Sequence, residues 1–265
     1  MLRRSDACDD TAGPSPASST RCRRLALVLI ALGAMLQAPP LRAAGAPVVG
    51  KLTWYGQSCF LLETAAGTRV LMDPFGKTAG RALPAGLRAD LVTISHEHPD
   101  HNNPRMSTGS PRVIHGLTAD KKGWARVDEK FRDVAIRSVG VYHDGKRGAV
   151  QGLDTVFIFE VGGLRIAHLG DLGHILDDDQ LEAIGSVDVL LVPVGGGTTL
   201  DAYQATRVID QLHPRLMIIP MHYTPATLEL FLERKANVRK AESPTVTLTS
   251  VKARPATEIV LLPAP

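Results

Sequence analysis

A turn rich in histidine and carboxylate side chains constrains this chain more than any other feature of its sequence. The apolar run Leu91–Ser95 has the length and composition of a buried strand, and the residues HEHPDH follow it directly. Side chains two positions apart in an extended chain project to the same side, and Pro99 then turns the chain back towards the same pocket. The four candidate metal ligands on this turn are His96, His98, Asp100 and His101.

The spacing of these residues narrows the type of metal site. A helical zinc site of the H-E-x-x-H type is excluded, because position 100 is Asp rather than His and Pro99 would break the helix. Imidazole suits zinc and other first-row metals, and carboxylates keep the site acceptable to manganese or iron. The alternative is a histidine-rich surface turn without a metal. The density of ligands after a buried strand favours the metal site.

Other parts of the chain must complete a site for two metal ions, because four residues of one turn cannot fill it. His143, Asp171 and His222 each lie where a predicted strand gives way to a loop. Loops at strand ends are the usual position of catalytic groups on α/β sheets. A single histidine or aspartate in such a position more often has a structural role than a metal-binding one. The shared position of these three residues at strand ends favours all of them as ligands.

The order of predicted elements indicates the fold class. Strands come first and units that alternate helix and strand follow, which favours an α/β sandwich with a mixed sheet and one domain over 47–265. Gly162 and Gly163 form the clearest hairpin turn, since tight hairpins require positive φ values. Gly195–Gly197 lacks a nucleotide-binding spacing, and we expect it to let backbone pass close to the site or to give the next helix a flexible entry. Strands are predicted at 51–55, 59–63, 69–72, 91–95, 155–161, 164–169, 187–194 and 216–219, with weaker signals at 113–115 and 133–142, and helices at 177–184 and 200–212.

The first 46 residues have the layout of a secretory signal peptide. Arg21, Arg23 and Arg24 precede the apolar run Leu25–Leu36, and small residues follow it. Spanning a bilayer takes roughly 20 apolar residues, so this run is short for a membrane helix. We therefore expect export to the periplasm and no stable membrane insertion after cleavage, with an uncleaved single anchor as the alternative.

Charge and cysteine content limit the classes of partner and the disulfides that are possible for the mature chain. Residues 1–43 hold six arginines and three aspartates, so their removal brings the formal charge from +3 to zero. A nucleic-acid partner requires clustered Lys and Arg, and the sequence shows no such cluster. Cys59 is the single cysteine after the targeting segment, so no internal disulfide can form there. We expect a small-molecule substrate, while the oligomeric state stays open.

The chain resembles the metallo-β-lactamase superfamily. The residues SHEHPDH match the H-x-H-x-D-H signature of that family, and the later pieces HD, GD and MHY look like its remaining motifs, over residues 51–224. The resemblance implies an α/β fold, a four-layer αββα sandwich with two mixed sheets. It implies that Asp171 bridges two metal ions and that Asp73 supports the metal-binding turn. It further implies one metal on His96, His98 and His143 and a second on Asp100, His101 and His222.

Departures from the family patterns narrow the resemblance. Drug-hydrolysing zinc β-lactamases of the commonest type have a cysteine among the second-site ligands, where this chain has Asp171. Flavodiiron proteins carry Glu at the place of His98 and an added flavin domain. The pieces WYGQSCF, DPF and GDLGH are most similar to the branch around ascorbate-phosphate lactonase and related hydrolases.

These residues predict a metal-dependent hydrolase. Two divalent cations, expected to be Zn²⁺ with Mn²⁺ or Fe²⁺ as alternatives, would lie about 3.5–4 Å apart around a hydroxide that attacks an ester, lactone, amide or phosphoryl centre. Asp100 is predicted to receive the proton as the nucleophile forms. His174 is predicted to orient the substrate or donate to the leaving group, or else to face solvent, and His115, His168 and His213 are expected to be structural. Rival functions are phosphodiester or thioester cleavage, an iron-dependent redox role, and a metal-stabilised binding protein without catalysis.

Overall fold

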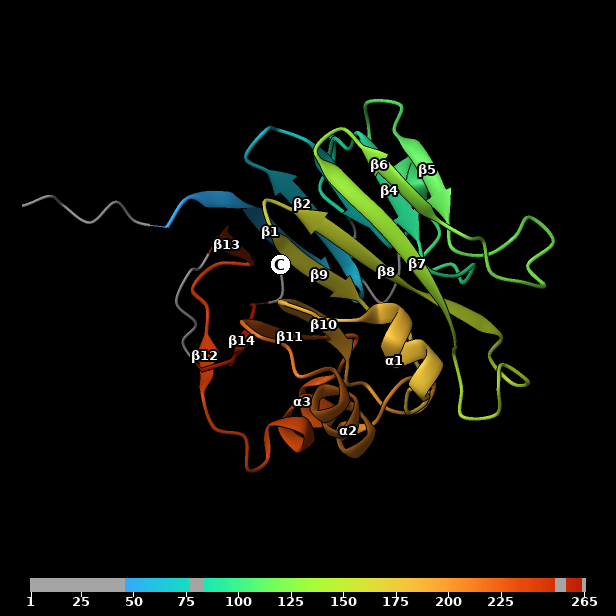
Figure 1. Ribbon diagram of the computed structural model, residues 1–265, viewed down its shortest axis with the longest axis vertical. Coiled ribbons are helices and arrows are strands. Elements are labelled where there is room, and N and C mark those ends of the chain that lie inside the picture. Colours follow the sequence, from blue (N-terminus) through green and yellow to red (C-terminus); the bar gives the residue numbers. More distant parts are fainter. Residues whose placement is uncertain (1–45, 77–82, 251–255, 264–265) are drawn as a thin grey trace, which may run out of the picture. The chain divides into compact units, whose positions relative to one another are not determined.

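Two mixed β-sheets face each other across a shared apolar core in this computed structural model (Figure 1). The structure describes residues 46–76, 83–250 and 256–263, which belong to one unit of the chain, Ala44–Pro265. All of the predicted signal peptide except Ala46 lies outside these residues. None of the helices in the described ranges is long and apolar enough to span a membrane.

The first sheet comes mainly from the N-terminal half of the described chain. Its strand order is β13-β1-β2-β3-β4-β5, in which β3, β4 and β5 run parallel and the other neighbours are antiparallel. The strands are β1 (Val48–Gly56), β2 (Cys59–Thr64), β3 (Arg69–Met72), β4 (Leu91–Ile94), β5 (Arg112–His115) and β13 (Thr245–Thr249).

The second sheet has the order β12-β14-β11-β10-β9-β8-β7-β6. The strands from β12 to β9 run parallel, and the strands from β9 to β6 alternate in direction. They are β6 (Asp128–Phe131), β7 (Val134–Tyr142), β8 (Leu153–Val161), β9 (Leu164–His168), β10 (Val189–Pro193), β11 (Met217–Met221), β12 (Val238–Lys240) and β14 (Glu258–Leu261).

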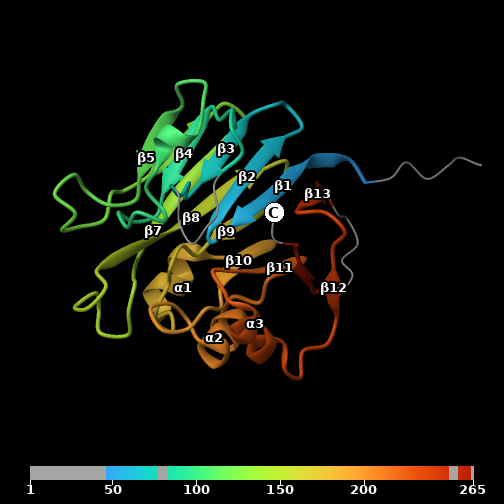
Figure 2. The same ribbon diagram turned by 180° about the vertical axis from the view of Figure 1, so that it is seen from behind.

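Three helices cover the outer face of the second sheet along β9, β10 and β11 (Figures 1 and 2). They are α1 (Asp178–Ile184), α2 (Ala202–Leu212) and α3 (Pro225–Leu232). Each begins with a capping box, in which the side chain of Asp177, Asp201 or Thr224 accepts the third backbone N–H of its helix. Within the described ranges, the outer face of the first sheet is covered by apolar loop residues such as Phe75 and Leu87 and by the short 3₁₀ helix Pro104–Met106.

The structure confirms the predicted α/β sandwich with two mixed sheets. It adds β6, α3, β12, β13 and β14, which the sequence pattern did not reveal. The weak strand signal at 133–142 corresponds to β7, which pairs antiparallel with β6. Arg132 has a positive φ of 53° in the turn that joins the two strands. β6 reads DEKF and alternates exposed and half-buried side chains, so it carries little hydrophobic periodicity.

Burial of apolar side chains between the two sheets should make the largest contribution to the free energy of unfolding. Phe159 on β8 is fully buried there and pairs with Ile136 on β7 and Ile166 on β9. We expect Phe159→Ala to lower the free energy of unfolding by about 3–5 kcal/mol, because it removes a large buried ring and leaves a cavity. Chemical denaturation measures the change. The control Tyr203→Ala, at a side chain that is 68% exposed, should change it by less than about 0.5 kcal/mol, and an equal effect of both variants would contradict the prediction.

Candidate metal centre

The carboxyl ends of several strands meet at one edge of the sandwich. β9, β10 and β11 run parallel, and β7 runs in the direction of β9 because both are antiparallel to β8. The predicted ligands follow these ends: the 96–101 turn comes after β4, His143 after β7, Asp171 after β9 and His222 after β11. Strand direction therefore explains why residues far apart in sequence converge.

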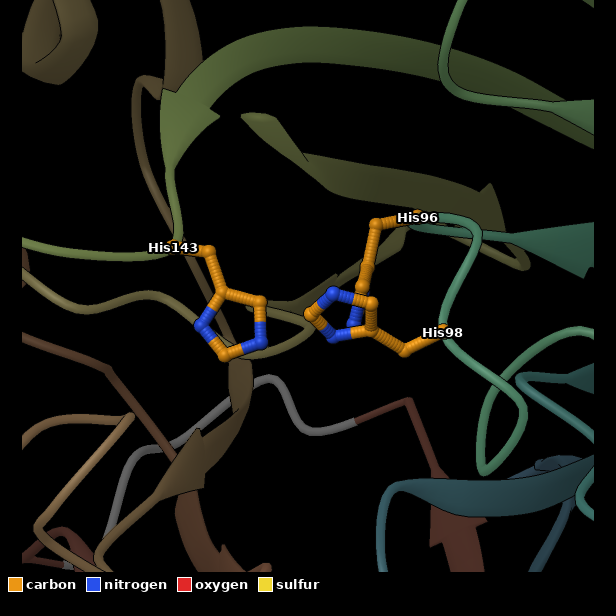
Figure 3. A group of neighbouring side chains, drawn as sticks. All are labelled: His96, His98 and His143. Carbon is orange, nitrogen blue, oxygen red and sulfur yellow. The ribbon is translucent and has the colours of Figure 1, made fainter. Parts of the chain in front are cut away.

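All seven predicted ligands lie together. Their ligand atoms form three overlapping groups, within each of which all atoms lie within 4.8 Å of one another. Figure 3 shows the His143 ring facing the His96 and His98 rings from the other side of the first group. The first and third groups have the membership predicted for the two metal sites. The groups are His96, His98 and His143; His96, His101 and Asp171; and Asp100, His101 and His222.

Asp171 lies at the centre of this cluster. Its Oδ2 is 3.2 Å from Nε2 of His101, 3.3 Å from Nε2 of His143 and 3.2 Å from Nε2 of His222. These three histidines come from both predicted sites, so a single carboxylate oxygen is within reach of each. The Asp171 side chain is almost fully buried, and a buried carboxylate without compensating charge is costly.

Asp73 holds the 96–101 turn against the end of β3. Its Oδ1 accepts the backbone N–H of Ser95 at 2.7 Å, and its Oδ2 accepts the Ser95 hydroxyl at 2.6 Å. His101 Nδ1 donates to the same Oδ2 at 2.9 Å, which directs His101 Nε2 towards Asp171. Asp73 has a positive φ of 43°, a strained conformation for a residue with a side chain, so its position is determined by the surrounding fold. The buttressing contact implied by the resemblance is present in this geometry.

Two further imidazoles, those of His143 and His96, are oriented through their Nδ1 atoms. His143 Nδ1 donates to the Thr198 carbonyl at 2.9 Å, and His96 Nδ1 lies 3.0 Å from the Ser95 hydroxyl and 3.2 Å from Asp154 Oδ1. Partners of this kind fix the tautomer of metal-binding histidines and point Nε2 at the metal. The Nε2 atom of His96 is buried and makes no hydrogen bond to any described residue, as expected for a donor atom reserved for a cation. The donor set therefore fits divalent metal ions.

Two glycines let backbone pass close to this centre. A Cβ on Gly195 would collide with the His222 carbonyl, and a Cβ on Gly173 would collide with the His143 carbonyl. The close approach expected for Gly195–Gly197 is confirmed at Gly195. His222 itself has a positive φ of 50°, so the chain turns sharply at the end of β11.

Electrostatics in the metal-free cluster follow from packing histidines around carboxylates. Burial alone would lower the pKa of His143, but close contact with the Asp171 carboxylate outweighs it and raises the pKa to about 9. The pKa of His101 is raised well above its usual value in the same way, against the effect of burial. His222 beside Asp100 lowers the pKa of that carboxyl to about 2, so Asp100 is ionised at neutral pH.

These shifts predict that metal uptake depends on pH. A divalent cation binds neutral imidazole, so at pH 7 it must displace the proton of His143, whose pKa is about 9. We expect affinity for Zn²⁺ to rise about tenfold per pH unit, for each proton displaced, from neutral pH to about 9 and then to level off. The raised His143 pKa also stabilises the metal-free fold below about pH 6.5, and this contribution is lost as pH rises through about 9.

Calorimetric titration of the metal-free protein in buffers of different ionisation enthalpy measures the number of protons released. An affinity that stays constant from pH 7 to 9, with no proton release, would contradict the assignment of His143 as a ligand.

The other predicted residues lie outside the ligand cluster. Both ring nitrogens of His174 engage the backbone: Nε2 accepts the Tyr142 N–H at 3.1 Å, and Nδ1 donates to the Ile175 carbonyl at 2.8 Å. A catalytic role for His174 therefore stays a prediction that requires one of these bonds to open. His168 lies in the core, and His115 contacts Glu97 at 2.8 Å. His213 ends α2 in a left-handed conformation.

Several supporting residues were not found from the sequence. Ser58, Asp154 and Thr198 contact the ligands, yet Ser58 and Thr198 stand in glycine-containing turns and Asp154 stands near the start of a strand. Thr198 acts through its backbone carbonyl, which no side-chain pattern reports. These residues are identified only by their contacts with the candidate ligands in the folded structure.

Comparisons with known proteins agree with this geometry. A family model described as the beta-lactamase superfamily domain matches residues 51–222. A metal-dependent hydrolase of Anaeromyxobacter sp. (strain K) is 31% identical over 266 aligned positions, which cover 85% of this chain and 96% of that protein. A metal-dependent hydrolase of Carboxydothermus hydrogenoformans is 30% identical, with 65% and 84% covered.

A solved structure from Thermotoga maritima is also similar. It is described as a Zn-dependent hydrolase of the metallo-β-lactamase superfamily, and it is 32% identical, with a TM-score of 0.63. The alignment covers 80% of this chain and 97% of that one. The predicted family resemblance is thereby confirmed, and the narrower similarity to the lactonase branch stays a prediction.

Proposed function

Because this chain belongs to the metallo-β-lactamase superfamily as a metal-dependent hydrolase, we propose that its seven clustered ligands hold two divalent cations that act together in hydrolysis. Zn²⁺ is the expected metal, with Mn²⁺ or Fe²⁺ as alternatives, since imidazole and carboxylate suit all three. The proposed substrates are small molecules with an ester, lactone or phosphoryl centre.

The observation that carries this proposal is the position of Asp171. One oxygen of its carboxylate lies 3.2–3.3 Å from histidines of both groups, which is the arrangement that a bridging ligand requires. A site for one ion would need only one of the groups. Two of the groups have three candidate ligands each and no member in common, which supports a site for two ions.

Each residue has a role that follows from its contacts. Bound cations would lower the pKa of water towards neutrality and polarise the scissile group of the substrate. Asp100 is partly exposed and ionised, and its Oδ2 lies 3.7 Å from His101 Nε2 and 3.8 Å from His222 Nε2. Its ionised state and partial exposure support a role as the acceptor of a proton from an attacking water. Asp73 and Thr198 accept the Nδ1 protons of His101 and His143, so Nε2 is the ring atom that would bind a cation once its own proton has been displaced.

Elemental analysis of protein purified without added metal, followed by a hydrolase screen, tests the proposal. We expect two equivalents of metal per chain and turnover of at least one member of a panel of lactones, phosphate esters, phosphodiesters and thioesters. Fewer than two equivalents after incubation with Zn²⁺ would overturn the two-ion site. Two equivalents without turnover across the panel would favour a metal-stabilised binding protein, and phosphodiester or thioester turnover alone would favour those rival reactions.

The proposal extends to cellular location. The basic residues and the apolar run before residue 46 support export to the periplasm as a mature domain from about residue 47. N-terminal sequencing of protein recovered from the periplasmic fraction tests this, with a start near residue 44 or 47 as the expected result. Recovery of the intact chain from the cytoplasm would overturn it.

A further inference from the structure

A turn of the first sheet reaches across the sandwich to two ligands carried by the second sheet. The turn between β1 and β2 contains Gln57 and Ser58. Ser58 Oγ donates to Asp171 Oδ1 at 3.3 Å, and the Gln57 carbonyl accepts the backbone N–H of His222 at 3.3 Å. This one turn therefore touches the central carboxylate and the last ligand of the centre.

His168 fixes the position of Ser58. Its Nε2 donates to the Ser58 carbonyl at 2.7 Å, and its Nδ1 accepts the Gly170 N–H at 3.2 Å. These bonds assign a neutral ring with the proton on Nε2, because a carbonyl can only accept and a backbone N–H can only donate. The ring is 1% exposed and packs edge-on against Phe60 at a centroid distance of 6.1 Å. It therefore joins the β1–β2 turn to the residue that precedes Asp171.

We propose that Ser58 and His168 are positioning residues that set the orientation of the Asp171 carboxylate. This inference rests on the proposed two-ion site. The Ser58 hydroxyl holds Oδ1, which leaves Oδ2 directed at the three imidazoles. Ser58 is fully buried, so no solvent can replace its hydrogen bond directly.

Loss of the hydroxyl should act through the geometry of Asp171. Without the donor at Oδ1, the carboxylate can rotate and present either oxygen, or both, towards the cations. Mutation of residues that orient metal ligands typically weakens metal affinity about 10- to 100-fold. We expect an effect of this size on the second equivalent of metal, because Asp171 would be the ligand shared by both ions.

Equilibrium binding of Zn²⁺ and the absorption spectrum of the Co²⁺-loaded protein test the inference in Ser58→Ala. We expect about 10- to 100-fold weaker binding of the second Zn²⁺ and a changed Co²⁺ spectrum. His168→Leu should show the same change. His168→Gln, which keeps a side-chain N–H donor, should restore part of the affinity.

Thr53→Val is the matched control. It removes a hydroxyl from β1 instead of the β1–β2 turn, and the Thr53 Oγ1 atom pairs with Thr245 Oγ1 at 2.8 Å. This variant should bind both ions as the wild type does. A measurable loss of metal affinity in it, equal to that in Ser58→Ala, would overturn the specific role of Ser58.

The outcomes separate this inference from the proposed function. A wild type that binds fewer than two Zn²⁺ overturns the proposed function and this inference with it. A wild type that binds two, together with a Ser58→Ala variant that binds both equally tightly, overturns this inference alone. Should Ser58→Ala fail to fold, nitrogen NMR of His168 in the metal-free wild type decides. A proton on Nε2 supports the inference, and a proton on Nδ1 overturns it.

Discussion

Asp171→Ala is expected to abolish tight binding of a metal pair and to lower turnover by about a thousandfold or more, which corresponds to ~4 kcal/mol of transition-state stabilisation. The physical reason is that Asp171 Oδ2 lies within 3.3 Å of three imidazoles, which come from both proposed metal groups. Its removal leaves several buried, partly charged rings without a counter-charge. Metal content by elemental analysis and kcat on the substrate found in the screen measure the effect.

Two controls make the result interpretable. Asp171→Asn keeps the shape of the side chain but removes its charge, so it should lose metal while retaining the folded spectrum. Asp120→Asn changes an aspartate that is fully exposed on the surface and should leave both metal content and kcat unchanged. Retention of two tightly bound ions in Asp171→Ala would refute the central position of this residue.

Asp100→Asn is expected to lower kcat by about 10²- to 10⁴-fold, the usual contribution of a positioned proton acceptor. Asp100 lies at the accessible side of the cluster, and its low pKa of about 2 shows that the ionised form is the resting state. The amide can still coordinate weakly through its oxygen but cannot take a proton. Measurement of kcat and KM at a fixed, saturating metal concentration separates loss of proton transfer from loss of metal.

The fold should survive this change, because the Asp100 side chain is 27% exposed and is not a member of the apolar core clusters of the described residues. Thermal unfolding of Asp100→Asn should therefore match that of the wild type. Unchanged kcat in the purified, metal-loaded variant would end the assignment of Asp100 as a catalytic residue. The parallel variant His98→Ala, which removes a candidate metal ligand, should abolish hydrolysis without unfolding the chain.

The convergence of the seven candidate ligands could be predicted because histidine and carboxylate residues are concentrated in one turn and recur at the ends of strands. The 96–101 turn follows a run of apolar residues, and each later candidate ligand follows a strand. The ends of these strands bring the residues to the same edge of the sandwich. The strands themselves were predictable where both faces are buried, as in β4 and β10. β12 has three exposed residues and offers no such signal.

The supporting contacts depend on packing that the sequence does not encode locally. Ser58 meets Asp171 from a position 113 residues away, and His143 meets the carbonyl of Thr198 at a separation of 55 residues. Neither pair has a spacing rule, since the first contact arises only when the two sheets pack face to face and the second only when the loops after β7 and β10 meet in the second sheet. His174 is the opposite case. Its position close to Asp171 in the sequence suggested a catalytic role, but both of its ring nitrogens are hydrogen-bonded to backbone groups.

The division of the ligands between the two sheets has a consequence for unfolding. Residues 96–101 extend from the first sheet, whereas His143, Asp171 and His222 extend from the second. A cation bound by residues of both sheets would link the two sheets to each other. The cysteine in the described residues, Cys59, is free and forms no disulfide that could do so. Separation of the sheets would then require release of the ions. At a free metal concentration a thousand times Kd, each such ion would add about 4 kcal/mol to the work of opening the sandwich.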